Sequence, residues 1–425
     1  MSEPKVKAPR GTFDILGEEA RARAALEARA RALLEGAGYE RIETPAFEAT
    51  ELFSRTVGEA TDIVRKEMFT FEDAGGRSLT LRPEGTAPVC RAYVEHGMHK
   101  RRQPVKLWYL SSFFRHERAQ AGRYRQFWQV GAEALGSDDP ALDAELITLL
   151  STLLAQSGVR GLRLRLSSLG SPESRSDYRE LLQAHLQANA ERLSEDVRSR
   201  IELNPLRAFD SDHRGTQDVM KTAPRLLDHL TPSDAEHFAE VRALLEVAGV
   251  EYELDATLVR GLDYYTRTVF EFTSDALGAQ SGVGGGGRYD RLVEQLGGPP
   301  TSGIGWAAGV ERILLAGGQA EVAPRGAAPP PLELFIALAD ADADARRRTG
   351  FALLNEARAA GLSAQMDLGG RSLKGQLGYA DALGARWVVV LGDGEATLKD
   401  MQDGDQREIP AEAVVHAVLR GQHAL

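Results

Sequence analysis

The sequence predicts an α+β fold with a discontinuous first domain and a smaller second domain, and three observations support it. Residues 78–133 contain short apolar runs typical of strands, two of which flank a charged loop as in an antiparallel hairpin. Residues 171–248 are polar, helical in pattern and poor in strand formers, which predicts a helical insertion. After the proline-rich stretch 317–331, strand and helix patterns alternate, as in α/β domains with a mainly parallel sheet.

The elements of the first domain follow from local composition. A helix is predicted at 18–36, because two acids open it, alanine and leucine fill it, and glycine closes it. Apolar runs predict strands at 78–84, 106–115, 125–133 and 266–272. The second and third of these strands are joined by the polar loop 116–124, so we expect them to pair.

We place the first domain at 1–170 and 249–322, with the insertion at 171–248. Three consecutive prolines make 323–331 a semi-rigid linker. The second domain is then 332–425. Its expected strands are 332–338, 363–368 and 386–392, and its expected helices are 341–360 and 372–383.

The overall composition is that of a globular protein, with 425 residues, 43% hydrophobic and 27% charged. No apolar run approaches the roughly 18–20 residues that span a bilayer, and the first residues lack the apolar core of a signal peptide. The single cysteine, Cys90, excludes internal disulfides and multi-cysteine zinc sites, so we expect a reducing cytoplasm. With a net charge of −11, any nucleic-acid contact must use local basic patches.

The predicted hairpin carries the first candidate site. Residues two apart on a strand share a face, so Gln129, Gly131 and Glu133 lie together, with the glycine giving clearance. An amide and a carboxylate on one face suit a small polar ligand. Arg115, and across the loop Arg118, Arg123 and Arg125, suit phosphate because guanidinium groups bind it in a planar fork. The alternative is a solvated hairpin with salt bridges.

A second candidate site is RPEGTA, residues 82–87, at the end of a predicted strand. Glu84, Gly85 and Thr86 there could hold an ammonium group. The alternative is a helix N-terminus that Thr86 or Glu84 caps.

The glycine-rich stretch 281–292 contains Gly282, Gly284 and Gly287 in the pattern G-x-G-x-x-G. A dinucleotide-binding site is nevertheless not expected, because the flanking order builds no βαβ unit and no acidic residue follows at the required place. Close approach of the backbone to a ligand, or close packing, accounts better for the glycines.

Two further stretches combine glycine with arginine. GIGWAAGVERILL, residues 303–315, predicts an amphipathic helix that carries Arg312, and the alternative role of Arg312 is pairing with a neighbouring acid in a buried helix. LVRGLDYY, residues 258–265, brings Arg260, Tyr264 and Tyr265 together where a strand begins. The composition of the second stretch is unusual for the start of a strand.

The order of these stretches resembles the class II aminoacyl-tRNA synthetases. Residues 39–53, 114–133 and 303–315 resemble the three class signatures, whereas Walker and class I signatures are absent. LVRGLDYY and GGGGRYD resemble the two signatures of the histidyl-tRNA synthetase family, over nearly the whole chain. The resemblance implies a catalytic domain with an antiparallel sheet flanked by helices, a helical insertion that folds over the tRNA acceptor end, and an α/β anticodon-binding domain.

The resemblance also implies the reaction, in which L-histidine and ATP form histidyl-adenylate before transfer to tRNA. Catalytic Arg115 would hold the α-phosphate beside the histidine carboxylate, and Arg312 would lie against adenine and reach the γ-phosphate. Catalytic Arg260 would reach the α-phosphate from the other side. All three would be ATP-binding residues, with Mg²⁺ accompanying ATP on its β- and γ-phosphates and no metal site of the protein's own.

In the histidine pocket that the resemblance implies, Glu133 and Tyr265 bracket the two ring nitrogens. Glu84, Thr86 and Gln129 take the α-amino group. Gly85 gives the backbone room, and Tyr264 lines the pocket.

The family further implies a homodimer with Pro45 at its interface, and tRNA contacts in the C-terminal domain. Arg371 and Lys374 are candidate contacts, whereas Arg346, Arg347 and Arg348 fit an exposed helix face better. The alternative function is the synthetase-like regulatory subunit of ATP phosphoribosyltransferase. Those paralogues typically lack the C-terminal domain and the catalytic arginines, both of which this chain has.

Overall fold

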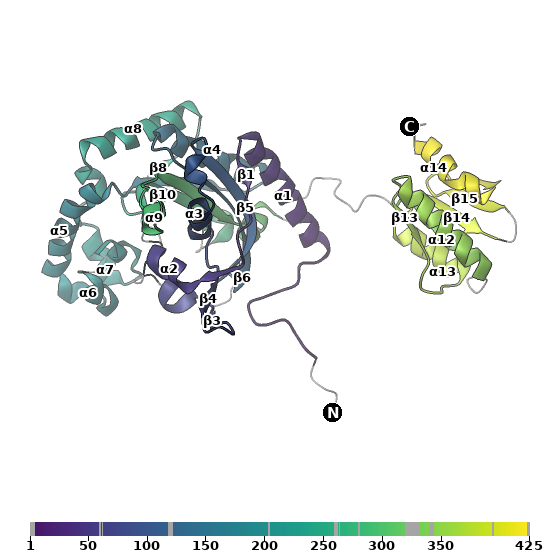
Figure 1. Cartoon of the computed structure of the whole chain (residues 1–425), viewed down its shortest axis with the longest axis horizontal. Coiled ribbons are helices and arrows are strands. Elements are labelled where there is room, and N and C mark those ends of the chain that lie inside the picture. The colour runs from purple at the N-terminus through teal and green to yellow at the C-terminus, as the bar shows by residue number, and fades with distance from the viewer. Residues whose placement is uncertain are drawn as a thin grey trace. The chain divides into compact units, whose positions relative to one another are not determined.

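The computed structural model describes residues 5–58, 61, 63–117, 122–202, 205–258, 262, 264–278, 281–318, 332–339, 344–392 and 395–422. The chain divides into two compact units, Met1–Pro324 and Arg325–Leu425 (Figure 1). Within the described residues, none of the helices is long and apolar enough to cross a bilayer.

An eight-stranded sheet forms the centre of the first unit, in the order β1-β5-β6-β11-β10-β9-β7-β8. In that order the strands are Glu40–Arg41, Val105–Phe114, Gln126–Leu135, Gly303–Gly309, Gly282–Arg288, Thr266–Ser274, Leu162–Ser168 and Glu253–Leu254. Every pairing from β5 to β7 is antiparallel, and only the short edge strands β1 and β8 pair in parallel. The predicted β5–β6 hairpin is therefore present, next to edge strand β1 of a larger, mainly antiparallel sheet.

Helices cover one face of this sheet. They are α1 (Gly17–Gly36), α4 (Pro140–Gln156), α8 (Pro232–Val247) and α10 (Val310–Gly317). Their apolar side chains share one buried cluster with Trp108 and Trp306 of the sheet. Successive residues of a strand point to opposite faces, so Tyr109 belongs to the cluster on the other face.

The other face carries the active-site candidates and the predicted insertion. The helices there are α3 (Thr86–Glu95), α5 (Pro172–Ala188), α6 (Glu195–Arg200), α7 (Arg214–Met220) and α9 (Leu292–Gln295), with short turns η2 (Met98–Lys100), η3 (Ala190–Arg192), η4 (Pro205–Asp210) and η5 (Leu226–His229). The turn η6 (Asp275–Leu277) lies beside α10 on the first face. Figure 1 shows α5, α6 and α7 grouped at one end of the unit. The final helix of the predicted insertion, α8, instead packs on α4 in the core of the sheet's opposite face.

A small second sheet, β2-β4-β3, completes the first unit. Its parts are β2 (Phe47–Ala49), α2 (Thr50–Thr56), η1 (Ile63–Glu67), β3 (Thr70–Glu72) and β4 (Ser78–Leu81). The chain passes from β4 directly into the RPEGTA stretch and α3, which places that stretch beside β5.

The second unit has a five-stranded sheet in the order β13-β12-β14-β15-β16. The elements that the sequence predicts are β12 (Leu334–Leu338), α12 (Asp344–Ala359), β13 (Ala364–Met366), α13 (Leu373–Ala382) and β14 (Trp387–Leu391). Their strands pair in parallel. The sequence did not predict β15 (Ala396–Asp400), β16 (Gln406–Ile409), η7 (Ala411–Ala413) or α14 (Val414–Gln422), of which the two strands add antiparallel pairs.

Candidate active site

A cavity of about 560 Å³ opens on the insertion-bearing side of the sheet and collects most of the predicted site residues. Those on its wall are Glu84, Gly85, Thr86, Arg115, Gln129, Tyr264, Tyr265 and Arg312. They come from four separate stretches of sequence that β5, β6, β9 and β11 bring side by side. Arg260 lies outside the described residues, and Glu133 lies behind the wall.

Glu84 has two roles at the start of α3. Its Oε2 accepts from the Thr86 N–H at 2.7 Å and its Oε1 from the Ala87 N–H at 2.9 Å, so the alternative of a helix cap is correct for Glu84. The Tyr264 hydroxyl donates to the same Oε2 at 3.3 Å. Burial nevertheless raises the pKa of Glu84 despite these donors. The carboxyl is therefore fixed on the cavity wall, where a positively charged group would stabilise its ionised form.

Glu133 lies fully buried beneath this corner of the cavity. Its Oε1 accepts from Thr86 Oγ1 at 2.7 Å and from the Tyr109 hydroxyl at 3.3 Å. Its Oε2 accepts from the Tyr289 hydroxyl at 2.6 Å. Burial raises the pKa of Glu133 to about 8, even though the Tyr289 and Thr86 hydroxyls lower it. A ligand that carries positive charge or an N–H donor would favour the carboxylate.

Tyr109 is a site residue that the sequence analysis missed. It lines the cavity from β5 and lies directly opposite Gly131 in the β5–β6 pair. A Cβ at Gly131 would lie 2.3 Å from Tyr109 Cζ, and one at Gly85 would lie 2.5 Å from the same atom. The space left by both glycines is therefore occupied by the Tyr109 ring. A glycine opposite an aromatic residue on adjacent strands is the sequence signal that could have identified Tyr109.

Gln129 carries an unsatisfied acceptor just behind the cavity wall. The residue lines the cavity, and its buried Oε1 has no hydrogen-bond partner among the described residues. An unpaired buried acceptor costs about 1–3 kcal/mol, which a ligand donor would recover. Gln129 and Glu84 thus form an acceptor pair suited to an ammonium group.

The opposite part of the cavity is cationic. Arg115, Arg123 and Arg312 line it together. The Arg115 Nε donates to the Pro83 carbonyl at 2.9 Å, and its guanidinium lies 5.3 Å from the Phe127 ring centroid. Burial and the neighbouring charge of Arg123 lower the pKa of Arg312. Arg123 and Arg312 repel each other, and Arg115 and Arg123 both lie beside Glu117, so a polyanionic ligand such as a chain of phosphates would relieve the repulsion.

The other arginines of the predicted phosphate site lie in or beside the hairpin loop. Arg123 lies 3.3 Å from Glu117, whereas Arg125 is not on the cavity wall and donates to the Glu117 carbonyl at 3.5 Å. Arg118 lies outside the described residues. The alternative of salt bridges across the loop is therefore correct for Arg123, which also reaches the cavity.

Arg312 reaches the cavity wall from α10, where the charges of Glu271 and Glu117 act on it. Its Nε donates to the Gly282 carbonyl. The acid beside it, Glu311, pairs instead with Arg23 at 2.8 Å and accepts from the Trp128 N–H. The helix thus holds Arg312 toward the cavity while Glu311 anchors it to α1.

The glycine-rich stretch forms a central strand, β10, between β9 and β11. Both pairings are antiparallel, so a dinucleotide-binding βαβ unit is excluded here. Gly284 and Gly285 line the cavity. A Cβ at Gly286 would lie 1.9 Å from the Gly305 carbonyl oxygen, so close packing accounts for that glycine. The strand gives the cavity a floor that is mostly backbone, with Val283 as its one larger side chain there.

This arrangement suits an amino acid beside a nucleoside triphosphate, and comparison with known proteins agrees. The family model for histidyl-tRNA synthetase matches residues 11–313, more than half of the chain. The chain belongs to the histidyl-tRNA synthetase family. The model of the anticodon-binding domain matches residues 341–420, in the second unit.

Histidyl-tRNA synthetases from several bacteria match nearly the whole chain. The histidine–tRNA ligase of Halorhodospira halophila is 49% identical and covers 99% of both chains, and that of Desulfitobacterium hafniense is 47% identical over 95% of this chain and 96% of its own. The apo histidyl-tRNA synthetase of S. aureus superposes with a TM-score of 0.81 at 37% identity, covering 97% of this chain and 100% of its own. The predicted family and fold class are confirmed.

A weaker match concerns the alternative function. A structure from Bacillus halodurans, described as an ATP phosphoribosyltransferase regulatory subunit/histidyl-tRNA synthetase, has a TM-score of 0.63 at 22% identity. It covers 92% of this chain and 100% of its own, and at this identity it shows the fold alone. The histidyl-tRNA synthetase family is the better supported of the two.

The described residues contain no group of three or more His, Cys, Asp or Glu that could hold a metal ion. Acidic residues do reach the cationic side of the cavity, where Glu67, Glu117 and Glu271 line the wall.

Proposed function

We propose that this chain activates L-histidine with ATP in the cavity of the first unit and passes the histidyl group to the 3′ end of its tRNA. The ATP-dependent histidine–tRNA ligase activity predicted from the sequence is confirmed by the family. The roles of individual residues are our proposal. The observation that carries them is the unpaired Gln129 Oε1, in the same cavity as Glu84, Arg115 and Arg312.

The α-amino group of histidine binds Glu84, Thr86 and Gln129. Gln129 Oε1 and the Glu84 carboxylate each accept one ammonium hydrogen, and the Thr86 hydroxyl oxygen accepts another while it donates to Glu133. Gly85 leaves room for the Tyr109 ring beside this group. The bound ammonium group lies beside Glu84, and its positive charge lowers the pKa of that carboxyl.

The imidazole ring binds between Tyr265 and Glu133. Neutral imidazole has one donor and one acceptor nitrogen, so the Tyr265 hydroxyl donates to one nitrogen. Glu133 Oε1 accepts from the other once the Tyr109 hydroxyl, which lies 3.3 Å from it behind the wall, turns away. Tyr264 packs against Tyr265, with ring centroids 4.8 Å apart, and lines the pocket. We refer to Glu84, Gln129, Glu133, Tyr264 and Tyr265 as the histidine pocket.

The arginines hold ATP and act on charge in the transition state. A carboxylate oxygen of histidine bonds to the α-phosphorus while the bond from that phosphorus to the bridging oxygen breaks, and pyrophosphate leaves. Arg115 stabilises the α-phosphate from one side and Arg260 from the other, and Arg312 binds adenine and the γ-phosphate. Mg²⁺ bound to the β- and γ-phosphates neutralises the leaving group.

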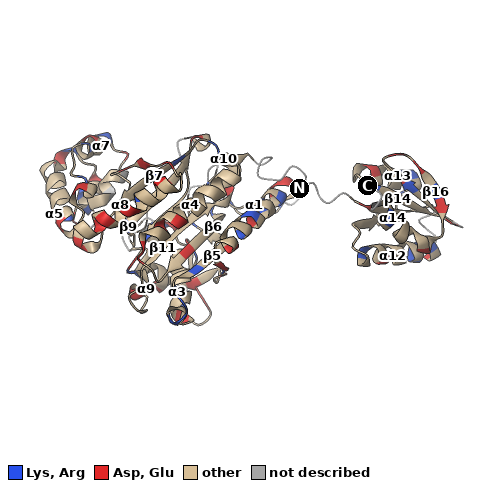
Figure 2. Ribbon diagram, turned by 90° about the horizontal axis from the view of Figure 1, so that it is seen from above, with Lys and Arg blue, Asp and Glu red and all other residues tan. Residues whose placement is uncertain are grey.

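In the second step, a terminal ribose hydroxyl of tRNA attacks the histidyl carbonyl carbon and AMP leaves. The segment 171–248 folds over the acceptor end, and the domain 332–425, joined by the linker 323–331, binds the anticodon. Figure 2 shows basic and acidic residues interspersed along both units, so tRNA contacts must be local. Arg371, just before α13, is a candidate because its guanidinium lies 4.1 Å from the Tyr379 ring centroid, and Lys374 lies in the first turn of that helix.

The arginines at 346–348 are not proposed as tRNA contacts, because they lie on the surface of helix α12. Arg347 and Arg348 are exposed on α12, and Arg348 lies 4.0 Å from Asp344. We further propose that the chain acts as a homodimer in the cytoplasm, with Pro45 at the subunit interface. Sedimentation that finds a fully active monomer would remove the dimer from the proposal.

The proposed reaction is tested by ATP–pyrophosphate exchange with each amino acid in turn. Histidine should support exchange, and glycine, proline and threonine should not. Arg260→His should lower kcat for exchange by at least ~100-fold, the scale for one preorganised donor. No exchange with any amino acid would favour the regulatory-subunit alternative, and near-normal exchange in Arg260→His would remove the role of that arginine.

A further inference from the structure

The strand that follows the two pocket tyrosines starts with an irregularity at Arg267. Its φ is +45°, and it is the only non-glycine residue with positive φ among the described residues. The register of β9 against β10 shifts at the same place, between Gly287 and Arg288. A non-glycine residue in this conformation costs roughly 1–3 kcal/mol and persists only where its surroundings hold it.

The backbone around Arg267 is held by the residues that lead into the insertion. The Arg267 N–H donates to the Gly170 carbonyl at 2.9 Å, and the Arg267 carbonyl accepts from the Leu169 N–H at 2.7 Å. Arg175, in the first turn of α5, donates to the Tyr265 carbonyl at 3.1 Å. The segment from Tyr265 to Arg267 is thus tied to the start of the insertion on both sides of Thr266.

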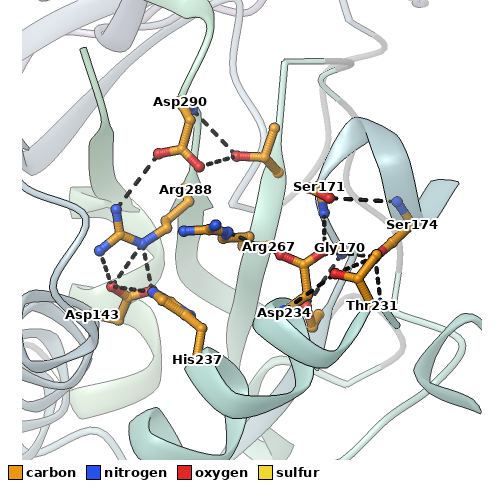
Figure 3. A network of polar contacts seen from close by, with 12 residues as sticks. Asp143, Gly170, Ser171, Ser174, Thr231, Asp234, His237, Arg267, Arg288 and Asp290 are labelled. Carbon is orange, nitrogen blue, oxygen red and sulfur yellow. Dashed lines mark hydrogen bonds and ion pairs between the residues drawn. The ribbon is translucent and has the colours of Figure 1, made fainter. Parts of the chain in front are cut away.

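Thr266 is fixed from the glycine-rich strand. Its hydroxyl donates to Asp290 Oδ2 at 3.0 Å and accepts from the Asp290 N–H at 3.2 Å. Asp290 follows Arg288, which forms a fully buried ion pair with Asp143 of α4 (Figure 3). This anchor comes from the catalytic core rather than from the start of the insertion.

One buried carboxylate connects Arg267 to both ends of the insertion. Asp234, in the first turn of α8, is 1% exposed. Its Oδ1 accepts from Arg267 Nε at 3.0 Å, and its Oδ2 accepts from the Ser171 N–H at 2.8 Å and from Ser174 Oγ at 2.6 Å. Figure 3 shows Arg267 reaching toward Asp234, beside Ser171, Ser174 and Thr231. Asp234 is therefore where α5, α8 and the strand after the pocket meet.

The carboxylate is ionised at neutral pH. Burial would raise the pKa of Asp234, but the hydrogen bonds from Ser174 and Ser171 lower it to about 2. Ser171 caps α5 and Thr231 caps α8, so Asp234 has a fixed position relative to both helices. A fixed, charged acceptor is what a strained arginine needs as a partner.

We propose that Asp234 and Arg267 form a positioning pair for histidine binding. The ion pair holds Arg267 in its left-handed conformation, and this conformation sets the place of Tyr265 and Tyr264, two and three residues earlier, on the wall of the histidine pocket. The pair makes the histidine site depend on the insertion. This inference rests on the proposed function, because it assumes that the two tyrosines bind histidine.

The pair should act on histidine far more than on ATP. Tyr264 and Tyr265 lie beside Glu84, whereas the phosphate-binding arginines Arg115 and Arg312 come from the end of β5 and from α10. The hydrogen bonds of Arg267 go instead to residues that border the insertion. A displaced tyrosine pair therefore changes the histidine site and leaves Arg115 and Arg312 in place, so any effect through the nearby Arg260 should appear in kcat rather than in KM for ATP.

The test compares Arg267→Ala, Arg267→Gly and Asp234→Asn by ATP–pyrophosphate exchange. Alanine loses the anchor but keeps the cost of positive φ, so its backbone relaxes and KM for histidine should rise about 10-fold or more. Glycine adopts positive φ freely, so Arg267→Gly should keep a lower histidine KM than Arg267→Ala. Asp234→Asn presents an amide to the guanidinium and should resemble Arg267→Ala. KM for ATP should stay within about 2-fold in all three.

The melting temperature separates positioning from mere stability. At a positive φ glycine is less strained than alanine under either reading, so a residue that only stabilised the fold would lower the melting temperature of the variants and leave KM for histidine unchanged. The matched control is Arg163→Ala on the neighbouring strand β7. It removes an exposed ion pair with Asp275 and should leave both KM values unchanged. If Arg267→Ala does not fold, the test uses Arg267→Gly and Asp234→Asn. In both, KM for histidine should rise above the wild-type value while KM for ATP stays within about 2-fold.

Two results would overturn the inference. One is equal change of the histidine and ATP KM values in the variants, and the other is a histidine KM in Asp234→Asn equal to that of wild type. Both leave wild-type exchange with histidine intact. Failure of the proposed function would appear instead as a wild-type protein that supports no exchange with histidine at all.

Discussion

Gly131 and Tyr109 lie directly opposite each other in the β5–β6 pair, and a Cβ on the glycine would lie 2.3 Å from Tyr109 Cζ. No side chain can occupy position 131 unless the ring moves. The Tyr109 hydroxyl donates to Glu133 and its ring lines the cavity, so this glycine determines the shape of the histidine pocket.

Gly131→Ala should therefore damage the pocket as well as the fold. Overpacking of this kind typically costs about 1–3 kcal/mol, and the displaced ring should also raise KM for histidine. Thermal unfolding and exchange kinetics measure both effects. Gly378→Ala is the matched control, because a Cβ added at Gly378 in helix α13 would have nothing within 4 Å, and the change should leave histidine KM unchanged. An unchanged histidine KM in a folded Gly131→Ala protein would contradict the role of Tyr109.

Glu133→Gln should change how stability depends on pH. Burial raises the pKa of Glu133 to about 8, so the folded protein retains a proton that the unfolded chain releases near pH 4.5. The stability associated with this proton is fully present below about pH 4.5 and is lost as the pH rises through about 8. Glutamine cannot lose a proton, so the variant should gain in melting temperature relative to wild type between pH 5 and about 9.

The control for that measurement is Glu95→Gln, at the exposed end of α3, where Glu95 pairs with Arg91 at 2.6 Å. The difference in melting temperature between Glu95→Gln and wild type should not grow with pH above 5 in the way expected for Glu133→Gln. Parallel melting curves for wild type and Glu133→Gln at every pH would contradict a raised pKa at Glu133.

Tyr265→Phe should weaken histidine binding selectively. Removing the hydroxyl strands a ring nitrogen in a dry site, which costs roughly 1–3 kcal/mol, or about 5- to 150-fold in histidine KM. KM for ATP should change little. Tyr252→Phe, which removes an exposed hydroxyl bonded to Glu246, should change neither constant. Histidine and ATP constants that rise together in Tyr265→Phe would indicate that Tyr265 only packs.

Deleting 332–425 should spare ATP–pyrophosphate exchange far more than tRNA charging. The second unit is compact by itself, and the cavity is lined by residues of the first unit. Exchange and charging should be measured on a truncated protein whose folding and oligomeric state match those of the full chain. Equal loss of both activities in such a protein would contradict the assignment of tRNA binding to the second unit.

The sequence predicted best the elements with strong local patterns. The β5–β6 hairpin, helix α1 and the first five elements of the second unit follow from apolar runs, caps and glycine stops. It failed for β16, whose residues are largely exposed and carry no strand pattern. It also did not predict that the glycine-rich stretch forms a strand, because glycine is unfavourable in strands unless neighbouring backbone requires it.

The site shows the same division. Charged and polar candidates such as Glu84 and Arg312 stand out because their residue types imply chemistry. Tyr109 and Arg267 do not, since their importance comes from pairing with Gly131 across the sheet and with Asp234 from a distant helix. Only a three-dimensional structure brings residues 109 and 131, or 234 and 267, together.

The most direct test of the account is a crystal structure of the protein with histidinol and ATP, since histidinol lacks the carboxylate and cannot react. The imidazole ring should lie between Tyr265 and Glu133, with the amino group on Glu84 and Gln129 and the α-phosphate on Arg115. Histidinol bound outside this cavity, or bound with its amino group toward Glu133 and its ring toward Gln129, would contradict the assignment of the histidine pocket.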